Sequence, residues 1–277
     1  MLKGGAEHLR IVDCRWVLGH PGSGAQAYAA GHLPGAVHVD LDTDLADPAG
    51  LGAPGRHPLP SAAAFARLVA SLGIAPATMV VAYDDVGGWV AARLWWMLDV
   101  LGHRRVAVLD GGIDAWVAAG GELTTDVPVV EPAEVHLADR WDRVITRDEL
   151  KDRLGSVVLL DARGAPRYRG ETEPIDPVAG HIPTARSLPT DANLVSPGGR
   201  FRAPSELAAS FAELGADGSG GPVVTSCGSG VSALHHALAM RVAGLPDPIL
   251  YVGSYSDWSR SGEPVVTGPE PGEPPAR

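Results

Sequence analysis

The feature that most constrains this chain is an internal repeat. Blocks from the first half return in the second half in the same order: "IVDCR" as "LLDAR", "AGHLPGA" as "AGHIPTA", "GRHPLPSAAAF" as "GRFRAPSELAASF", and "LDGGIDAW" as "YVGSYSDW". The spacing is almost constant, as matched residues illustrate: Asp13 with Asp161, His32 with His181, and Trp116 with Trp258. Such a repeat indicates two copies of one fold of roughly 120 residues, a common domain size.

The repeat also sets the expected domain boundaries. We predict a first domain over residues 1–123, a linker over 124–142 and a second domain over 143–266. Residues 267–277 are rich in proline and glycine, so we expect them to form a flexible tail.

Each copy alternates strand patterns with helix patterns. The apolar runs "VVLLDAR" and "PVVTSC" are typical of strands covered on both faces. The segment "SELAASFAELGA" predicts a helix with a serine N-cap and a glycine at its end. This alternation predicts an α/β fold in which each copy is a mainly parallel sheet flanked by helices.

Composition narrows the classes of partner. The net charge of −11 argues against a nucleic-acid-binding surface. No apolar run approaches the ~20 residues needed to cross a bilayer, and the first residues show no apolar signal core, so we predict a cytoplasmic protein without a membrane partner. Two cysteines, Cys14 and Cys227, are too few for a disulfide framework and fit a reducing compartment.

Cys227 stands between a strand pattern and a helix pattern, on a glycine-rich turn. Ligands of open α/β sheets bind beyond the carboxyl ends of the strands. Glycines let several backbone N–H groups point at one place, and the following helix presents its positive end there. We therefore predict a cradle for an anion around the Cys227 sulfur. Its members are Gly228, Ser229, Gly230, Val231 and Ser232. The alternative, an inert cysteine on a tight turn, explains this loop less well.

At this point the sequence resembles the tandem-domain sulfurtransferases of the rhodanese family. The two "GH" blocks, the two tryptophan-ending blocks and "CGSGVSA" carry the resemblance, which extends over nearly the whole chain. It implies two rhodanese-like domains. It also implies that Cys227 accepts a sulfane sulfur, becomes a persulfide and passes the sulfur to a thiol or to cyanide. The first copy has Asp84 in place of the cysteine, which implies a catalytically silent domain.

The resemblance also bears on donor and acceptor. "CGSGVSA" is similar to the loop of 3-mercaptopyruvate sulfurtransferases, and Arg167 matches the substrate-binding arginine of the family. Some mercaptopyruvate enzymes carry a second arginine before the "GHIP" block, where "ETEPIDPVAGHIP" has none. Arg163 and Arg169 are expected in surface or interface ion pairs. Thiosulfate is the alternative donor. The expected acceptor is a small thiol or a thioredoxin-like protein.

Ser229 matches a loop serine for which a Ser-His-Asp set has been proposed in the family. His32 and, more weakly, Asp13 are the possible partners by resemblance. The competing interpretation, that His32 and His181 simply cap turns in both copies, is favoured because one copy is silent. We predict no metal and no cofactor.

Two other classes of protein compete with this interpretation. A cysteine phosphatase would have a longer loop that closes with an arginine. A non-catalytic binding module would have no need to retain Cys227.

Overall fold

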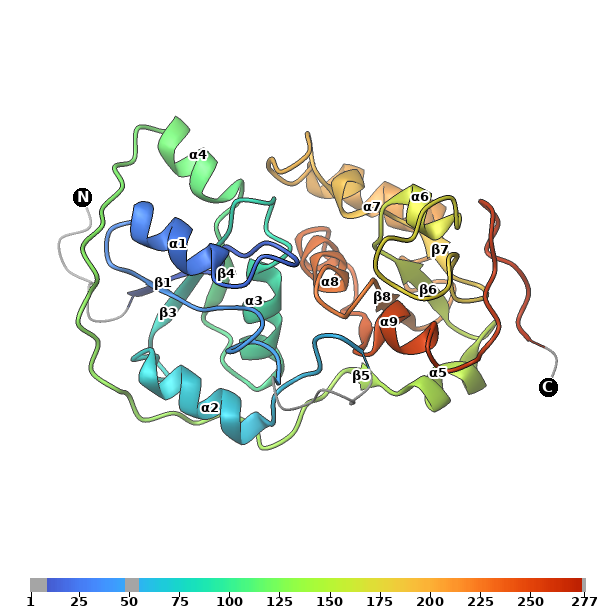
Figure 1. Cartoon of the computed structure of the whole chain (residues 1–277), viewed down its shortest axis with the longest axis horizontal. Coiled ribbons are helices and arrows are strands. Elements are labelled where there is room, and N and C mark those ends of the chain that lie inside the picture. Colours follow the sequence, from blue (N-terminus) through green and yellow to red (C-terminus); the bar gives the residue numbers. More distant parts are fainter. Residues whose placement is uncertain (1–8, 48–54, 276–277) are drawn as a thin grey trace. The chain divides into compact units, whose positions relative to one another are not determined.

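The computed structural model describes residues 9–47 and 55–275 (Figure 1). The chain divides into two compact units. The first consists of Met1–Pro48, Leu59–Asp142 and Ser196–Arg200, and the second consists of Ala49–Pro58, Arg143–Val195 and Phe201–Arg277. The short segment before Leu59 therefore belongs with the second half of the chain.

A four-stranded parallel sheet forms the centre of the first unit, in the order β2-β1-β3-β4. Its strands are β1 (Leu9–Asp13), β2 (Ala36–His38), β3 (Met79–Tyr83) and β4 (Val106–Val108). Its helices are α1 (Ser23–Ala30), α2 (Ala62–Ser71), α3 (Ala91–Val100) and α4 (Gly112–Ala118). Helix α3 is buried along its whole length, because apolar residues occupy most of each face; its two charged residues, Arg93 and Asp99, are buried as well.

The second unit repeats this arrangement with one strand more. Its parallel sheet has the order β5-β9-β8-β6-β7. The strands are β5 (Val144–Ile145), β6 (Val158–Asp161), β7 (Arg186–Ser187), β8 (Val223–Ser226) and β9 (Ile249–Tyr251). The helices are α5 (Arg147–Arg153), α6 (Ala165–Tyr168), α7 (Pro204–Glu213), α8 (Ala233–Val242) and α9 (Ser254–Trp258), with a 3₁₀ turn at Thr190–Asn193. The predicted tandem α/β fold is confirmed, and helices flank each sheet (Figure 1).

The core explains why the strand runs are continuously apolar. In β6, Leu159 packs into one apolar cluster, while Val158 and Leu160 pack into another. Successive side chains of a strand point to opposite faces, so both faces of this sheet are covered. All residues of the neighbouring strand β8 are buried too, so its carboxyl end emerges directly from the core.

Local signals place the starts of some helices. Thr146 caps α5, and Glu149 completes a capping box with it. The prediction for α7 was wrong in one detail: the helix begins at Pro204, with Ala203 rather than a serine as N-cap. Proline is favoured in the first turn of a helix, and Glu206 accepts the backbone N–H of Ala203.

The two histidines of the "GH" blocks have the same surroundings in each unit. His32 stacks on Tyr28 and bonds the carbonyls of Tyr28 (2.8 Å) and Asp126 (3.1 Å). In the second unit, His181 stacks on Tyr168, with matching bonds to Tyr168 O (2.8 Å) and Glu270 O (3.1 Å). Each ring thus links its own "GH" block to a later segment of the same unit, at Asp126 in the first and at Glu270 in the second.

The segment predicted as a flexible tail makes backbone hydrogen bonds to the second unit. Gly268 N donates to Arg169 O (2.9 Å), and Thr184 N donates to Pro271 O (2.6 Å). Within the described ranges, no helix has both the length and the apolar character that a membrane span requires.

Candidate active site

The Cys227 sulfur lies at the carboxyl end of β8, surrounded by backbone N–H groups. The side chain is 1% exposed. Its Sγ accepts hydrogen bonds from Ser229 N (3.4 Å) and Gly230 N (3.1 Å). Gly230 has φ +76°, and a Cβ there would lie 2.3 Å from Val252 O, so only glycine fits. The loop is thus shaped to stabilise negative charge on sulfur.

Val231 and Ser232 lead from this loop into α8. The N–H groups of Leu234 and His235 bond to their carbonyls and start the helix. The positive end of a ten-residue helix therefore lies at the loop, which adds to the stabilisation of an anion there.

The second tryptophan-ending block holds the backbone of Cys227 in place. The hydroxyl of Ser254 accepts Cys227 N–H (3.1 Å) and donates to Tyr251 O (2.8 Å). Tyr255 N donates to Cys227 O (2.9 Å). Ser254 adopts φ +51°, an uncommon left-handed conformation for a residue other than glycine. This strained residue fixes where the cysteine sits.

Ser229 has a partner that sequence reasoning missed. Its hydroxyl lies 2.7 Å from Nδ1 of His57, and both side chains are buried. His57 belongs to the second unit although it precedes α2 in the chain. The repeat contained a signal, because His57 departs from it: the matched residue of the second copy is Phe201.

The predicted partners of Ser229 have other contacts. Both ring nitrogens of His32 bond backbone carbonyls of the first unit. The carboxylate of Asp13 is bound by Arg15 (2.6 Å) and by the hydroxyl of Tyr83 (2.6 Å). The second unit has the equivalent pair, Asp161 with Arg163.

Arg163 is buried, not at a surface or interface as expected. It binds Asp161 (2.7 Å) and Gly180 O (2.7 Å), and its guanidinium stacks on the ring of Tyr255 at 3.7 Å. Removing the charged guanidinium from water costs free energy, and the ion pair with the carboxylate of Asp161 offsets this cost. Arg169, by contrast, forms an exposed pair with Glu171.

Arg167 lies beside the Cys227 loop. A Cβ built on Gly228 would lie 3.5 Å from Nη1 of Arg167. The rest of the guanidinium is held by Glu173 (2.7 Å) and Asp176 (3.2 Å). Burial opposes ionisation of Glu173, but hydrogen bonds from Arg167 and from backbone N–H groups keep its pKa below the ordinary value. The arginine is therefore oriented before any ligand arrives.

The matching loop of the first unit has a carboxylate in place of sulfur. Asp84 is fully buried and accepts four backbone N–H groups, two on each oxygen. The donors are Val86 (3.0 Å), Gly88 (2.8 Å), Val90 (2.9 Å) and Ala91 (2.9 Å). Burial raises the pKa of Asp84, although the four donors counteract this. A carboxylate cannot accept a sulfane sulfur.

Neither the other cysteine nor the adjacent histidines form a second centre. Cys14 is fully buried in the first unit, and burial together with Asp13 and Asp84 raises the pKa of its thiol well above the ordinary value. His235 stacks on Phe201, and His236 bonds Thr225 (2.9 Å). Among the described residues, no group of three or more His, Cys, Asp or Glu side chains is arranged to hold a metal ion.

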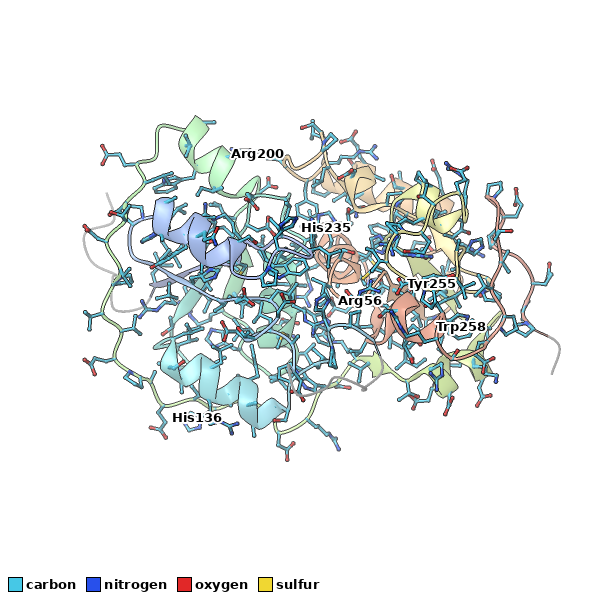
Figure 2. All side chains as sticks on the ribbon, viewed as in Figure 1. Arg56, His136, Arg200, His235, Tyr255 and Trp258 are labelled. Atoms are coloured by element: carbon cyan, nitrogen blue, oxygen red, sulfur yellow. The ribbon has the colours of Figure 1, made fainter. Side chains whose placement is uncertain are left out.

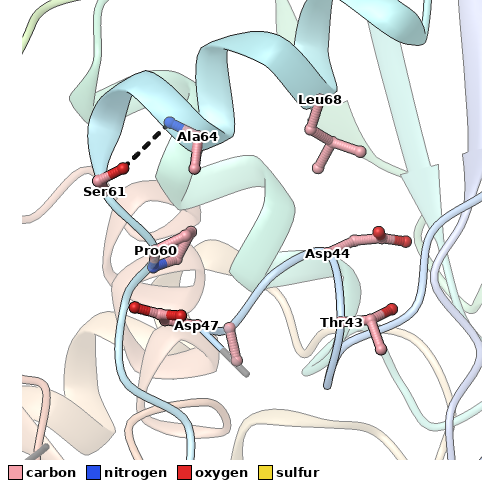
Figure 3. A pocket seen from close by; sticks show the side chains of 8 residues that line it. Thr43, Asp44, Asp47, Pro60, Ser61, Ala64 and Leu68 are labelled. Atoms are coloured by element: carbon pink, nitrogen blue, oxygen red, sulfur yellow. Dashed lines mark hydrogen bonds between the residues drawn. The ribbon is translucent and has the colours of Figure 1, made fainter. Parts of the chain in front are cut away.

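The first unit also contains a cavity of about 320 Å³ near the start of α2 (Figure 3). Its lining comprises Thr43, Asp44, Ala46, Asp47, Pro60, Ser61, Ala64 and Leu68. The hydroxyl of Ser61 accepts Ala64 N–H (3.1 Å) as a helix cap. This lining supplies no sulfur atom that could carry a sulfane group.

Comparison with known proteins identifies the family of this chain. The model of the rhodanese-like domain family matches residues 1–119 and 146–261, one match for each half of the chain. The chain therefore belongs to the rhodanese family and is a tandem-domain sulfurtransferase.

Individual relatives sharpen this placement without agreeing on the donor. The chain is 44% identical to a probable 3-mercaptopyruvate sulfurtransferase of Pseudomonas aeruginosa, over 94% of this chain and 93% of that protein. It is 41% identical to a putative thiosulfate sulfurtransferase, SseB, of Mycobacterium tuberculosis, over 90% and 87%. The solved 3-mercaptopyruvate sulfurtransferase of Leishmania major is 34% identical, with a TM-score of 0.81 over 91% of this chain and 70% of that one.

Proposed function

We propose that this protein transfers sulfur from 3-mercaptopyruvate to a thiol or cyanide acceptor through a persulfide on Cys227. The observation that carries the proposal is the Cys227 sulfur, held by two loop N–H groups with the Ser229–His57 pair beside it. Arg167 at Gly228 supplies a cation for a carboxylate. The acceptor is a small thiol or a thioredoxin-like protein.

The first half-reaction loads the cysteine. The Cys227 thiolate attacks the sulfur of mercaptopyruvate, the carbon–sulfur bond breaks, and its electron pair leaves on carbon as the enolate of pyruvate. The proton of the donor's thiol group balances the step, because it ends on the methyl carbon of pyruvate. Ser229 and His57 are suited to relay that proton.

The second half-reaction transfers the outer sulfur of the Cys227 persulfide to the acceptor. The acceptor thiolate attacks the outer sulfur, the sulfur–sulfur bond breaks, and Cys227 returns as a thiolate. The loop N–H groups stabilise the anionic sulfur before and after each transfer, so one cradle serves the whole cycle.

Thiosulfate is the second candidate donor, because several similar relatives are named for it. The loop segment Gly228–Ala233 contains no basic residue. A dianion is therefore less well matched to this loop than a monocarboxylate.

Intact-mass measurement tests the proposal directly. We expect wild-type protein to gain one sulfur atom from mercaptopyruvate, and Cys227→Ser to gain none although Cys14 remains. The loss of steady-state transfer should be at least about a thousandfold, as for removal of a covalent nucleophile. An adduct that persists in Cys227→Ser would overturn the assignment, and an unmodified wild type would point to a non-catalytic module.

A further inference from the structure

A short segment before α2 is built into the second unit next to Cys227. Gly55 has φ +85°, and a Cβ there would lie 2.6 Å from Gly253 O, so the two backbones are in direct contact. Arg56 N donates to the hydroxyl of Ser256 on α9 (3.0 Å). Figure 2 labels Arg56 together with Tyr255 and Trp258 of that helix.

The side chain of Arg56 points toward the Cys227 loop. A Cβ on Gly228 would lie 2.9 Å from Nη2 of Arg56, closer than to Arg167. Nη1 forms an ion pair with Asp176. The buried Nε has no hydrogen-bond partner in the described part of the chain. Arg56 thus places the Nη2 edge of its guanidinium beside the residue that follows the cysteine.

Asp176 organises the charges around this loop. Its carboxylate is completely buried and is shared by Arg56, by Arg167 (3.2 Å) and by Arg260 (3.1 Å). Glu173 binds Arg167 as well. Three guanidinium groups therefore face two carboxylates, while Arg163 is matched by Asp161. One positive charge remains in excess among these side chains, while the Cys227 thiolate is stabilised separately by the loop N–H groups and the start of α8.

An excess of one charge has a consequence for the donor. A monocarboxylate balances it, whereas a dianion leaves a net negative charge in a largely buried site, which is costly. Without Asp176 the excess would be two, and a dianion would then be matched.

We infer that Arg56 and Asp176 set the charge of the sulfur donor: Arg56 is a second guanidinium for its carboxylate, and Asp176 positions Arg56 while limiting the site to one excess positive charge. This inference rests on the proposed sulfur transfer through Cys227. It assigns the second cation to a segment far from the "GHIP" block, where the sequence has no arginine.

The test compares two donors in full-length variants. Asp176→Asn should raise the ratio of kcat/KM for thiosulfate to that for mercaptopyruvate by about tenfold or more, because the dianion gains more from the added charge. Arg56→Gln should lower kcat/KM for mercaptopyruvate by about tenfold, chiefly through KM, and Arg56→Lys should recover part of it. Arg169→Gln is the matched control for Arg56→Gln. It removes one positive charge from the exposed pair with Glu171, and it should leave the ratio of kcat/KM for the two donors unchanged.

The outcomes separate this inference from the proposed function. If mercaptopyruvate and thiosulfate both load Cys227 in the wild type, but neither variant changes the ratio or KM, the roles of Arg56 and Asp176 are refuted and sulfur transfer stands. If neither donor places sulfur on Cys227, the proposed function itself fails. Should Asp176→Asn not fold, Arg56→Gln decides alone, because that side chain is 21% exposed and its loss is tolerable. An unchanged KM for mercaptopyruvate in that variant would refute the inference.

Discussion

The Asp84 loop and the Cys227 loop use the same backbone device for different ends. Both follow a central strand of a parallel sheet, and both direct backbone N–H groups at one side chain. In the first unit the four donors are taken up by the carboxylate of Asp84. In the second, two donors hold a sulfur atom, and Ser229, His57 and Arg167 surround it. The first loop binds the carboxylate of its own Asp84, and the second is the loop that we propose to carry the transferred sulfur.

The two units share buried residues that hold the chain together. The buried pair of Asp13 with Arg15 returns as Asp161 with Arg163, and His32 returns as His181. What they do not share lies around the sulfur. Arg167 matches Gly19, and His57 matches Phe201. In this duplicated fold, the residues that we propose to act in sulfur transfer therefore lie at departures from the repeat rather than in the repeated motifs.

The largest effect is expected from removing the carboxylate of Asp84, which tests whether the first loop has a structural role. Asp84→Ala leaves four backbone N–H groups without this acceptor, three of them buried, which should lower the free energy of unfolding by roughly 3 kcal/mol or more. Sulfur transfer per folded molecule should persist. Chemical denaturation followed by both tryptophan fluorescence and activity measures this.

Asp85→Ala is the matched control, since the neighbouring side chain is exposed. Equal stability of the two variants would show that the first loop does not need its anion. Loss of transfer in well-folded Asp84→Ala would show that the first unit takes part in the chemistry.

Arg167 tests the functional side. Arg167→Ala removes a charge-assisted hydrogen bond to the donor carboxylate, so we expect a loss of roughly 1.5–3 kcal/mol, or about ten- to a hundredfold in kcat/KM for mercaptopyruvate. Arg167→Lys should recover only part, because an ammonium cannot make two parallel bonds. Kinetics with both donors provide the measurement. A variant as active as the wild type would remove Arg167 from the binding site.

The sequence predicted the fold and the Cys227 loop because their signals are local. Apolar runs define β6 and β8, and the glycines with Cys227 define the turn. It did not predict His57 or Arg56 at the site, since 172 residues separate His57 from Ser229 and no local pattern reports such a contact. The burial of Arg163 was missed for a related reason. Its partner Asp161 is two residues away, but the ring that covers it, Tyr255, comes from α9.

The helices that follow the two loops differ in acid sensitivity at one position. His236 of α8 is fully buried, and burial lowers its pKa to about 4, whereas α3 contains no histidine. A lowered folded-state pKa favours the neutral ring, so this stability is complete above the unfolded pKa of 6.5 and is lost as the pH falls toward 4. At pH 5 the loss should be about 2 kcal/mol. Denaturation of wild type and His236→Gln at pH 7 and pH 5 measures it, and equal pH dependence in both would contradict the assignment.

The smallest expected effects separate two buried histidines of different function. His57→Ala removes the partner of Ser229, and kcat/KM should fall by about tenfold, or ~1.4 kcal/mol, because water can also protonate an enolate. His32→Ala instead removes a buried ring that bonds two backbone carbonyls and stacks on Tyr28, so it should lower stability by about 1–3 kcal/mol and leave transfer per folded molecule unchanged. His181→Ala, in the second unit, should resemble His32→Ala in its effect on stability. If His32→Ala lost activity without losing stability, the histidine of the repeated motif would belong to the site after all, and the rule that departures from the repeat carry the chemistry would fail at that residue.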